Sequence, residues 1–275
     1  MEEFKIGILD MYQGVSNEGM RCIKMLVEDF FDKIDQKASY TIFDVRGNSE
    51  IPNLDEFDGF ISSGGPGSPL LENHDWEKKY FDFIENLMFH NKTENNKKHL
   101  FAICHSFQLL YQYFELGIVN KRKSTSFGVM PMHRYKSSKK EIILGDLLDP
   151  FWAVDSRDYQ AIKPNHKRFE EFGAKLLCIE KDRPHVPLER AVMAVRFTKE
   201  IFGTQFHPEA DAEGMHRLFK TEEKKVAVIK NFGINKYEDM IVHLEDPDKI
   251  LFTESIIIPN FLKIAFEASK MAVLI

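Results

Sequence analysis

The strongest constraint on the fold is an alternation, over the first 114 residues, between short apolar runs and longer amphipathic patterns. Four apolar runs have the length of buried strands: residues 4–9, 40–45, 57–62 and 100–104. Apolar residues recur at helical spacing in three further segments: 20–31, 76–87 and 107–114. Strands alternating with helices predict a doubly wound, mostly parallel sheet that binds ligands at the carboxyl ends of its strands. We therefore expect an α/β fold.

The second half of the chain has a different pattern. Short extended runs follow one another with polar turns between them: residues 127–132, 141–144, 175–180, 191–197 and 201–206. Such runs predict antiparallel strands added to the parallel sheet. Helical spacing then returns in three segments: one from Met215 to Ile229, one capped by Asn235 and one opened by Pro259. We expect one α/β domain over residues 1–210, with a helical C-terminal extension, residues 211–275, packed on it.

The composition argues against several classes of protein. The net charge of −6 argues against a broad nucleic-acid surface, which requires a clustered basic excess. No apolar run approaches the roughly 20 residues that span a bilayer, and acidic residues flank the first run, so we expect neither a membrane segment nor a signal peptide. Three scattered cysteines favour a reducing compartment, so a cytoplasmic protein is expected.

Cys104 follows the fourth apolar run and precedes a helical pattern, so its thiol is expected on a strand-to-helix turn. The opening of a helix has unpaired N–H groups and a positive dipole end, both of which favour the reactive thiolate. A buried structural cysteine is the commoner alternative. The position therefore makes Cys104 a candidate nucleophile that needs a base.

His207 and Glu209 are the candidate base and orienting acid. Residues two apart in an extended backbone point to the same face, so the carboxylate can hold the imidazole while the imidazole faces a thiol. The glycines of residues 64–67 can supply N–H groups for an oxyanion, although an ordinary turn is the alternative reading. A metal site of Cys104, His207 and Glu209 would have only three mixed ligands, so no metal is expected. No nucleotide-binding glycine motif is present, and we expect no cofactor.

Three segments resemble the motifs of the class I glutamine amidotransferases, among them the glutaminase domain of guanylate synthase. They are Ser63-Gly64-Gly65-Pro66-Gly67, Ala102-Ile103-Cys104-His105-Ser106-Phe107-Gln108 and Gly203-Thr204-Gln205-Phe206-His207-Pro208-Glu209. The resemblance implies a flavodoxin-like fold and hydrolysis of the glutamine side-chain amide through a glutamyl thioester. By motif position, it makes Cys104 the nucleophile, His207 the base and then the acid, and Glu209 the orienting carboxylate.

The resemblance also implies roles for three further residues. The backbone N–H groups of Gly65 and His105 would hold the oxyanion, and Gln108 would help to hold the amino acid end of the substrate. The substrate would be glutamine or another γ-glutamyl compound.

The chain departs from the family pattern at three positions. Ala102 and Ser106 stand where the family usually has glycine, two residues before and two after the cysteine. Both are small, so the turn is expected to form with an altered shape. Asp158 stands where the family often has histidine, which predicts an altered substrate pocket, and the nearby His166 is expected to be solvated rather than to replace that histidine.

Three functions are compatible with these residues. Residues 211–275 are too few for an ATP-using synthetase domain, so the first is an amidotransferase that passes ammonia to a separate synthetase partner. The second is a stand-alone γ-glutamyl hydrolase or peptidase. The third is a non-catalytic binding module, which has no physical need for the His-Pro-Glu segment. A homoserine acyltransferase matches the third motif less well.

Overall fold

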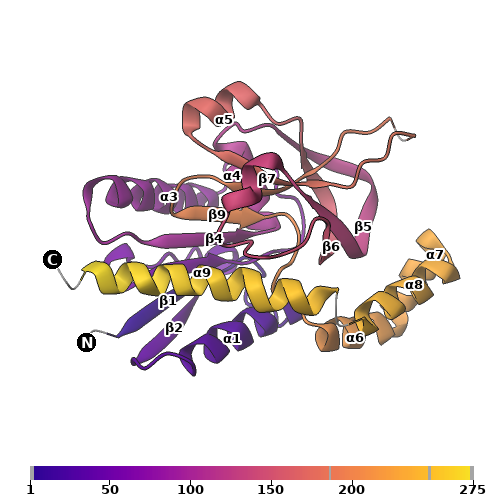
Figure 1. Ribbon diagram of the computed structural model, residues 1–275, viewed down its shortest axis with the longest axis horizontal. Helices are drawn as coiled ribbons and strands as arrows, with labels where there is room; N and C mark the ends of the chain where they lie inside the picture. Colours follow the sequence, from indigo (N-terminus) through magenta and orange to yellow (C-terminus); the bar gives the residue numbers. More distant parts are fainter. Residues whose placement is uncertain (1–2, 186, 247–248, 273–275) are drawn as a thin grey trace.

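The computed structural model describes residues 3–185, 187–246 and 249–272, and these form one nine-stranded sheet with helices on both faces (Figure 1). The strands are β1 (Phe4–Asp10), β2 (Ala38–Asp44), β3 (Gly59–Ser62), β4 (His99–Ile103), β5 (Ile118–Arg134), β6 (Phe151–Ile162), β7 (Lys175–Glu180), β8 (Val192–Arg196) and β9 (Ile201–Thr204). The helices are α1 (Glu18–Phe31), α2 (Val45–Asn48), α3 (Asp75–Thr93), α4 (His105–Tyr113), α5 (His166–Phe172), α6 (Ala212–Lys220), α7 (Glu222–Phe232), α8 (Ile234–Glu245) and α9 (Ile250–Ala272). The strand order is β2-β1-β3-β4-β9-β8-β7-β5-β6.

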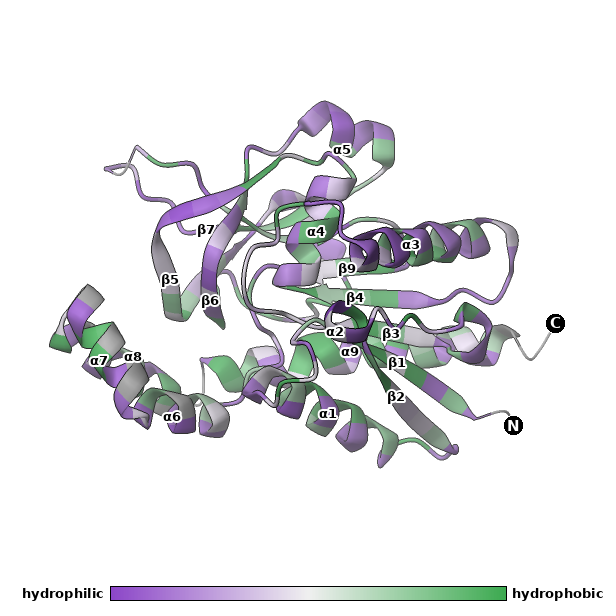
Figure 2. Ribbon diagram, turned by 180° about the vertical axis from the view of Figure 1, so that it is seen from behind, coloured by the Kyte–Doolittle hydropathy of each residue, from purple (hydrophilic) through white to green (hydrophobic). Residues whose placement is uncertain are grey.

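The parallel half of the sheet confirms the predicted α/β fold. Strands β2, β1, β3, β4 and β9 are mutually parallel. Apolar residues of α1 and α9 pack on one face of these strands, and those of α3 and α4 pack on the other. Hydrophobic residues accordingly gather in the central strands, whereas hydrophilic residues dominate much of β5 and the outer surface of α3 (Figure 2).

The antiparallel half adds β8, β7, β5 and β6, and its longest feature is the β5–β6 ribbon. The prediction of an extended run over residues 141–144 is wrong, because the chain forms turns there. The apolar side chains of Ile143 and Leu144 nevertheless pack in the core. Strand β6 was not predicted. Two of its core-facing residues, Asp155 and Arg157, are charged and paired with each other at 2.7 Å, which hides the apolar alternation that marks a strand.

The C-terminal helices differ from the prediction in three places. The helix expected from Met215 to Ile229 breaks into α6 and α7, which lets residues of both contact the end of the ribbon in one apolar cluster. Helix α8 begins at Ile234 after Gly233, whose φ is 86°, so Asn235 lies inside the first turn instead of capping it. Helix α9 runs through Pro259 rather than beginning there.

Burial explains why α9 tolerates its proline. An interior proline removes one helical hydrogen bond and costs about 3 kcal/mol. The side chains that flank Pro259 are each at most 1% exposed, because they pack against the sheet: Ile257, Ile258, Phe261 and Leu262. Burying such side chains offsets that cost.

The division of the chain at residue 210 stays a prediction. No described helix is both long and apolar enough to cross a membrane.

Candidate active site

Cys104 lies at the expected strand-to-helix turn, between β4 and α4. Its φ of 45° and ψ of −93° are rare for a residue with a side chain, and such strain is typical of a nucleophile held on a sharp turn. The N–H of Cys104 donates to the Thr204 carbonyl on β9 (2.8 Å), and its carbonyl accepts from the Gln108 N–H (2.9 Å). The backbone around the thiol is therefore fixed by both the sheet and the helix.

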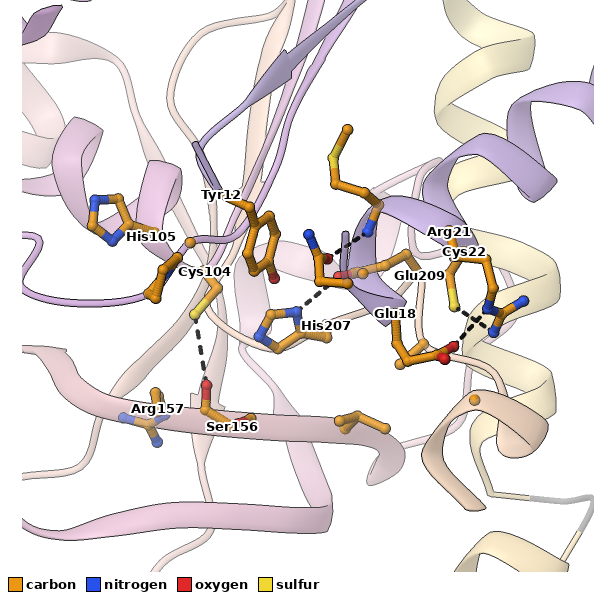
Figure 3. A pocket seen from close by; sticks show the side chains of 18 of the residues that line it. Tyr12, Glu18, Arg21, Cys22, Cys104, His105, Ser156, Arg157, His207 and Glu209 are labelled. Atoms are coloured by element: carbon orange, nitrogen blue, oxygen red, sulfur yellow. Dashed lines mark hydrogen bonds and ion pairs between the residues drawn. The ribbon is translucent and has the colours of Figure 1, made fainter. Parts of the chain in front are cut away.

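His207 and Glu209 lie on the segment that follows β9, and their side chains are paired. His207 Nδ1 is 2.8 Å from Glu209 Oε1, and the carboxylate is only 1% exposed. The N–H of His207 donates to the Val154 carbonyl of β6 (2.8 Å), which ties the imidazole-bearing backbone to the ribbon. In Figure 3 the imidazole lies between the Cys104 sulfur and the Glu209 side chain. The structure thus brings the three predicted residues together in the order thiol, imidazole, carboxylate.

The charges at this site favour a protonated imidazole. Burial alone would lower the pKa of His207, but the Glu209 carboxylate and the Cys104 sulfur outweigh it, and the pKa is raised well above 6.5. Cys104 Sγ is also 3.9 Å from the Ser156 carbonyl, a long and weak contact. An imidazolium beside the sulfur would stabilise the thiolate form that attacks carbonyl groups.

The glycine loop of residues 64–67 packs directly against these side chains. A Cβ added to Gly64 would lie 2.9 Å from His207 Cε1, and a Cβ added to Gly65 would lie 2.7 Å from the Met11 carbonyl oxygen. No side chain fits at either position without displacing the site. The hydrogen bonds found among the described residues do not use the Gly65 N–H, which leaves it available to an anion.

His105 and Gln108, predicted as oxyanion and substrate residues, both line the same cavity. His105 is the first residue of α4, where helix N–H groups lack intrahelical partners. Burial and the nearby Arg46 cation lower the pKa of its imidazole to about 3, and the ring also interacts with the Gly65 backbone. The Gln108 amide, however, donates to Gln205 Oε1 and to the Tyr159 carbonyl, each at 3.0 Å. In this structure that amide group joins α4 to β6 and to the segment after β9.

The three departures from the family pattern have separate structural settings. Ala102 of β4 pairs with Gly203 of β9. A Cβ added to Gly203 would lie 2.9 Å from the Ala102 carbonyl oxygen, so the glycine that this close packing requires is on the neighbouring strand. Ser106 is fully buried and hydrogen-bonded. Asp158 lines the cavity and accepts from Thr125 Oγ1 (2.5 Å). His166 begins α5 as an exposed residue.

The cavity around Cys104 has a volume of about 1250 Å³, and several residues that were not predicted contribute to it. Tyr12 follows β1, and its hydroxyl would be 3.0 Å from a Cβ on Gly64. Its place at the carboxyl end of a parallel strand is the signal that could have identified it. Phe127 from β5 and Met215 from α6 line the cavity at the ribbon and the C-terminal helices. The cavity is thus lined by residues from both halves of the chain.

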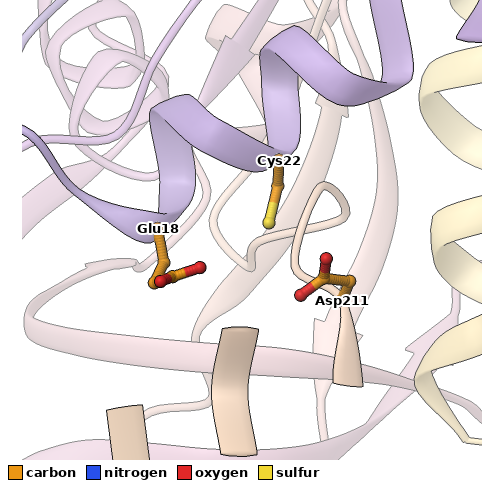
Figure 4. Close-up of side chains that lie close together, drawn as sticks. All are labelled: Glu18, Cys22 and Asp211. Carbon is orange, nitrogen blue, oxygen red and sulfur yellow. The ribbon is translucent and has the colours of Figure 1, made fainter. Parts of the chain in front are cut away.

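A cluster of three potential metal ligands lies on the cavity wall beside α1 (Figure 4). The ligand atoms of Glu18, Cys22 and Asp211 are within 4.8 Å of one another. The Arg21 guanidinium lies among them, with Nε 2.5 Å from Glu18 and Nη2 2.6 Å from Asp211. Burial raises the pKa of Cys22 to about 12, so its thiol is protonated at neutral pH. Arg21 pairs with both carboxylates, and Arg217 of α6 adds a second cation 3.2 Å from Glu18, so the cluster is an ion-pair network between α1 and α6.

The family model for class I glutamine amidotransferases matches residues 23–224. A search of the curated proteins found no significant match. A glutamine amidotransferase from Thermotoga maritima has a similar structure, with a TM-score of 0.67 and 15% sequence identity over 97% of this chain and 100% of that one.

Two further solved structures are similar. A putative GMP synthase subunit from Thermoplasma acidophilum gives a TM-score of 0.57 at 16% identity and covers 98% of each chain. The glutaminase domain of CTPS from Trypanosoma brucei, solved with bound acivicin, gives 0.53 at 14% identity, over 83% of this chain and 94% of that one. At these identities the structures establish a shared fold.

Proposed function

We propose that this chain hydrolyses a γ-glutamyl amide, because it belongs to the class I glutamine amidotransferase family. Its fold also places the Cys104 thiol, the His207 imidazole and the Glu209 carboxylate next to one another in that order. The observation that carries the proposal is the placement of Cys104 on a strained turn beside an imidazole whose other nitrogen is held by Glu209. A binding module would not need the strain or the buried carboxylate. Cys104, His207 and Glu209 are proposed as the catalytic residues.

In the first step, the Cys104 thiolate attacks the amide carbon of the substrate and forms a carbon–sulfur bond. The backbone N–H groups of Gly65 and His105 stabilise the negative oxygen of the tetrahedral intermediate. The His207 imidazolium then gives its proton to the leaving nitrogen, the carbon–nitrogen bond breaks, and ammonia departs from a glutamyl thioester. Glu209 keeps the imidazole in the orientation that this proton transfer requires.

In the second step, the now neutral His207 accepts a proton from a water molecule that attacks the thioester carbon. The tetrahedral intermediate collapses, the carbon–sulfur bond breaks, and glutamate is released. The imidazolium and the thiolate are restored together. We place this reaction in a reducing compartment such as the cytoplasm, because all three cysteines are free and the chemistry needs a thiol.

Two substrate classes follow from different observations. One structural neighbour is named as a putative subunit of GMP synthase, which favours glutamine as the substrate and a synthetase partner as the acceptor of ammonia. The cavity of about 1250 Å³ exceeds the roughly 300–1,000 Å³ of typical small-molecule sites. That excess favours a γ-glutamyl compound with a larger leaving amine as the second candidate.

The test is a substrate panel of glutamine and γ-glutamyl peptides without ATP, with ammonia and glutamate both measured. Ammonia from glutamine supports an amidotransferase, and amines from the peptides support a γ-glutamyl hydrolase. Cys104→Ser should abolish either activity, whereas the control Cys178→Ala, at a buried position of β7 outside the cavity, should retain it. Absence of turnover on every member of the panel, with and without candidate synthetases, would leave a binding function.

A further inference from the structure

A buried chain of hydroxyl groups links helix α4 to the glycine loop. The Tyr80 hydroxyl donates to Ser62 Oγ (3.1 Å), which lies 2.8 Å from Ser106 Oγ. Ser106 Oγ in turn donates to the Ser63 carbonyl (2.6 Å). Because Ser106 gives its single proton to that carbonyl, Ser62 must be the donor between the two serine hydroxyls. The hydroxyl groups of Tyr80, Ser62 and Ser106 therefore all donate in the direction of the glycine loop. Hydrogen bonds aligned in this way strengthen one another.

The Ser63 side chain forms two further hydrogen bonds that fix the backbone of the glycine loop. Ser63 Oγ accepts from the Met11 N–H (2.9 Å) and donates to the Gly64 carbonyl (2.8 Å). The Gly64 carbonyl and the Gly65 N–H belong to one planar peptide unit, so fixing the carbonyl fixes the direction of the N–H. Serine hydroxyls thus hold the carbonyls of the two consecutive peptide units that precede Gly65.

We propose that Ser106 and Ser63 are positioning residues that set the Gly65 N–H at the separation from the His105 N–H that an oxyanion requires. The inference rests on the proposed hydrolysis. The two donors come from different elements, since Gly65 follows β3 and His105 begins α4. Ser106 is the neighbour of His105 in α4, so its bond to Ser63 ties the two elements together where the donors lie. Oxyanion stabilisation depends on donors that are already aligned.

The outer side of the loop has its own anchor. Arg46 Nη1 donates to the Pro66 carbonyl (2.7 Å) and to the Met11 carbonyl (3.1 Å). The guanidinium also lies 5.5 Å from the centre of the Trp76 ring. Removal of the Ser106 hydroxyl should therefore change the direction of the loop peptides without releasing the loop.

The variants Ser106→Ala and Ser106→Gly both remove the hydroxyl, and the second restores the residue usual in the family. We expect each to lower kcat by about tenfold or more, with KM within twofold, because an oxyanion contact acts in the transition state. Ser138→Ala is the matched control, since Ser138 is fully buried and donates to the Tyr135 carbonyl (2.7 Å) away from the site. It should lower Tm and leave kcat unchanged. A Ser106→Gly enzyme with full kcat would overturn the proposal.

A second measurement compares two reagents that modify Cys104. A glutamine-like chloro-ketone reacts through a tetrahedral oxyanion, whereas iodoacetamide does not. Ser106→Ala should slow the chloro-ketone about tenfold relative to iodoacetamide. Equal slowing of both reagents, or of neither, would contradict a positioning role. If the wild-type protein neither reacts with the chloro-ketone nor turns over the panel, the proposed hydrolysis fails instead, so the two failures are distinguishable.

Discussion

Gly64→Ala tests how closely the glycine loop packs on the proposed base. The new Cβ would lie 2.9 Å from His207 Cε1 and 3.0 Å from the Tyr12 hydroxyl. Carbon atoms in contact prefer about 3.5–4.0 Å, so the imidazole would have to move by roughly 0.6–1 Å. The His207 ring is held by Glu209, so it cannot turn away without losing that contact. A displacement of about 1 Å costs on the order of 100-fold in rate, or about 2.7 kcal/mol at 1.36 kcal/mol per tenfold.

The assay is steady-state hydrolysis of the best substrate of the panel, with Tm measured on the same preparations. Gly173→Ala is the control, because Gly173 has a φ of 77° and no neighbouring atom within 4 Å of its added Cβ. That control should lose about 1 kcal/mol of stability from backbone strain and keep its kcat. The steric reasoning is refuted if Gly64→Ala retains kcat within threefold of the wild type. It is also refuted if the control Gly173→Ala loses kcat in the same proportion, since a general loss of stability would then explain the effect.

Three further predictions concern charge. Glu209→Gln should lower kcat by at least about 100-fold, because the carboxylate that holds and charges His207 is lost; a pH–rate profile unchanged from the wild type would contradict this. At pH 7, iodoacetamide should modify one thiol per chain, at Cys104, because Cys104 lines the cavity beside the His207 imidazole, whereas burial raises the pKa of Cys22 to about 12 and raises that of Cys178 as well; peptide mapping identifies the site. Burial, assisted by nearby acidic groups, raises the pKa of Glu254 from 4.5 to about 7, so its ionisation destabilises the fold progressively between those values and fully above pH 7. After discounting for partial exposure, Glu254→Gln should add about 1 kcal/mol, or roughly 2 °C in Tm, at pH 8 and almost nothing at pH 4.

The parallel half of the fold was predictable because its strands are buried on both faces and its helices are amphipathic. The ribbon was not, since β6 buries the ion pair of Asp155 and Arg157 where an apolar residue would mark a strand. Pro259 was misleading for a related reason. Tertiary burial on both sides of the proline outweighs a local signal for a helix start.

The candidate triad was predictable from residue types and spacing, together with the family resemblance. The support of the glycine loop was not, because it joins segments that are distant in sequence. Ser106 and Ser63 form a hydrogen bond across two elements, and Tyr12 lies just after the first strand. Such contacts depend on which strands become neighbours, and that order is a property of the whole sheet.

The backbone bond between His207 and the Val154 carbonyl determines when the site can exist during synthesis. Cys104 leaves the ribosome long before His207, and the His207 backbone can be fixed only after β6 is in place. A nascent chain ending before residue 207 would therefore carry a thiol with no imidazole beside it. The proposed hydrolytic activity should therefore appear in one late step of synthesis.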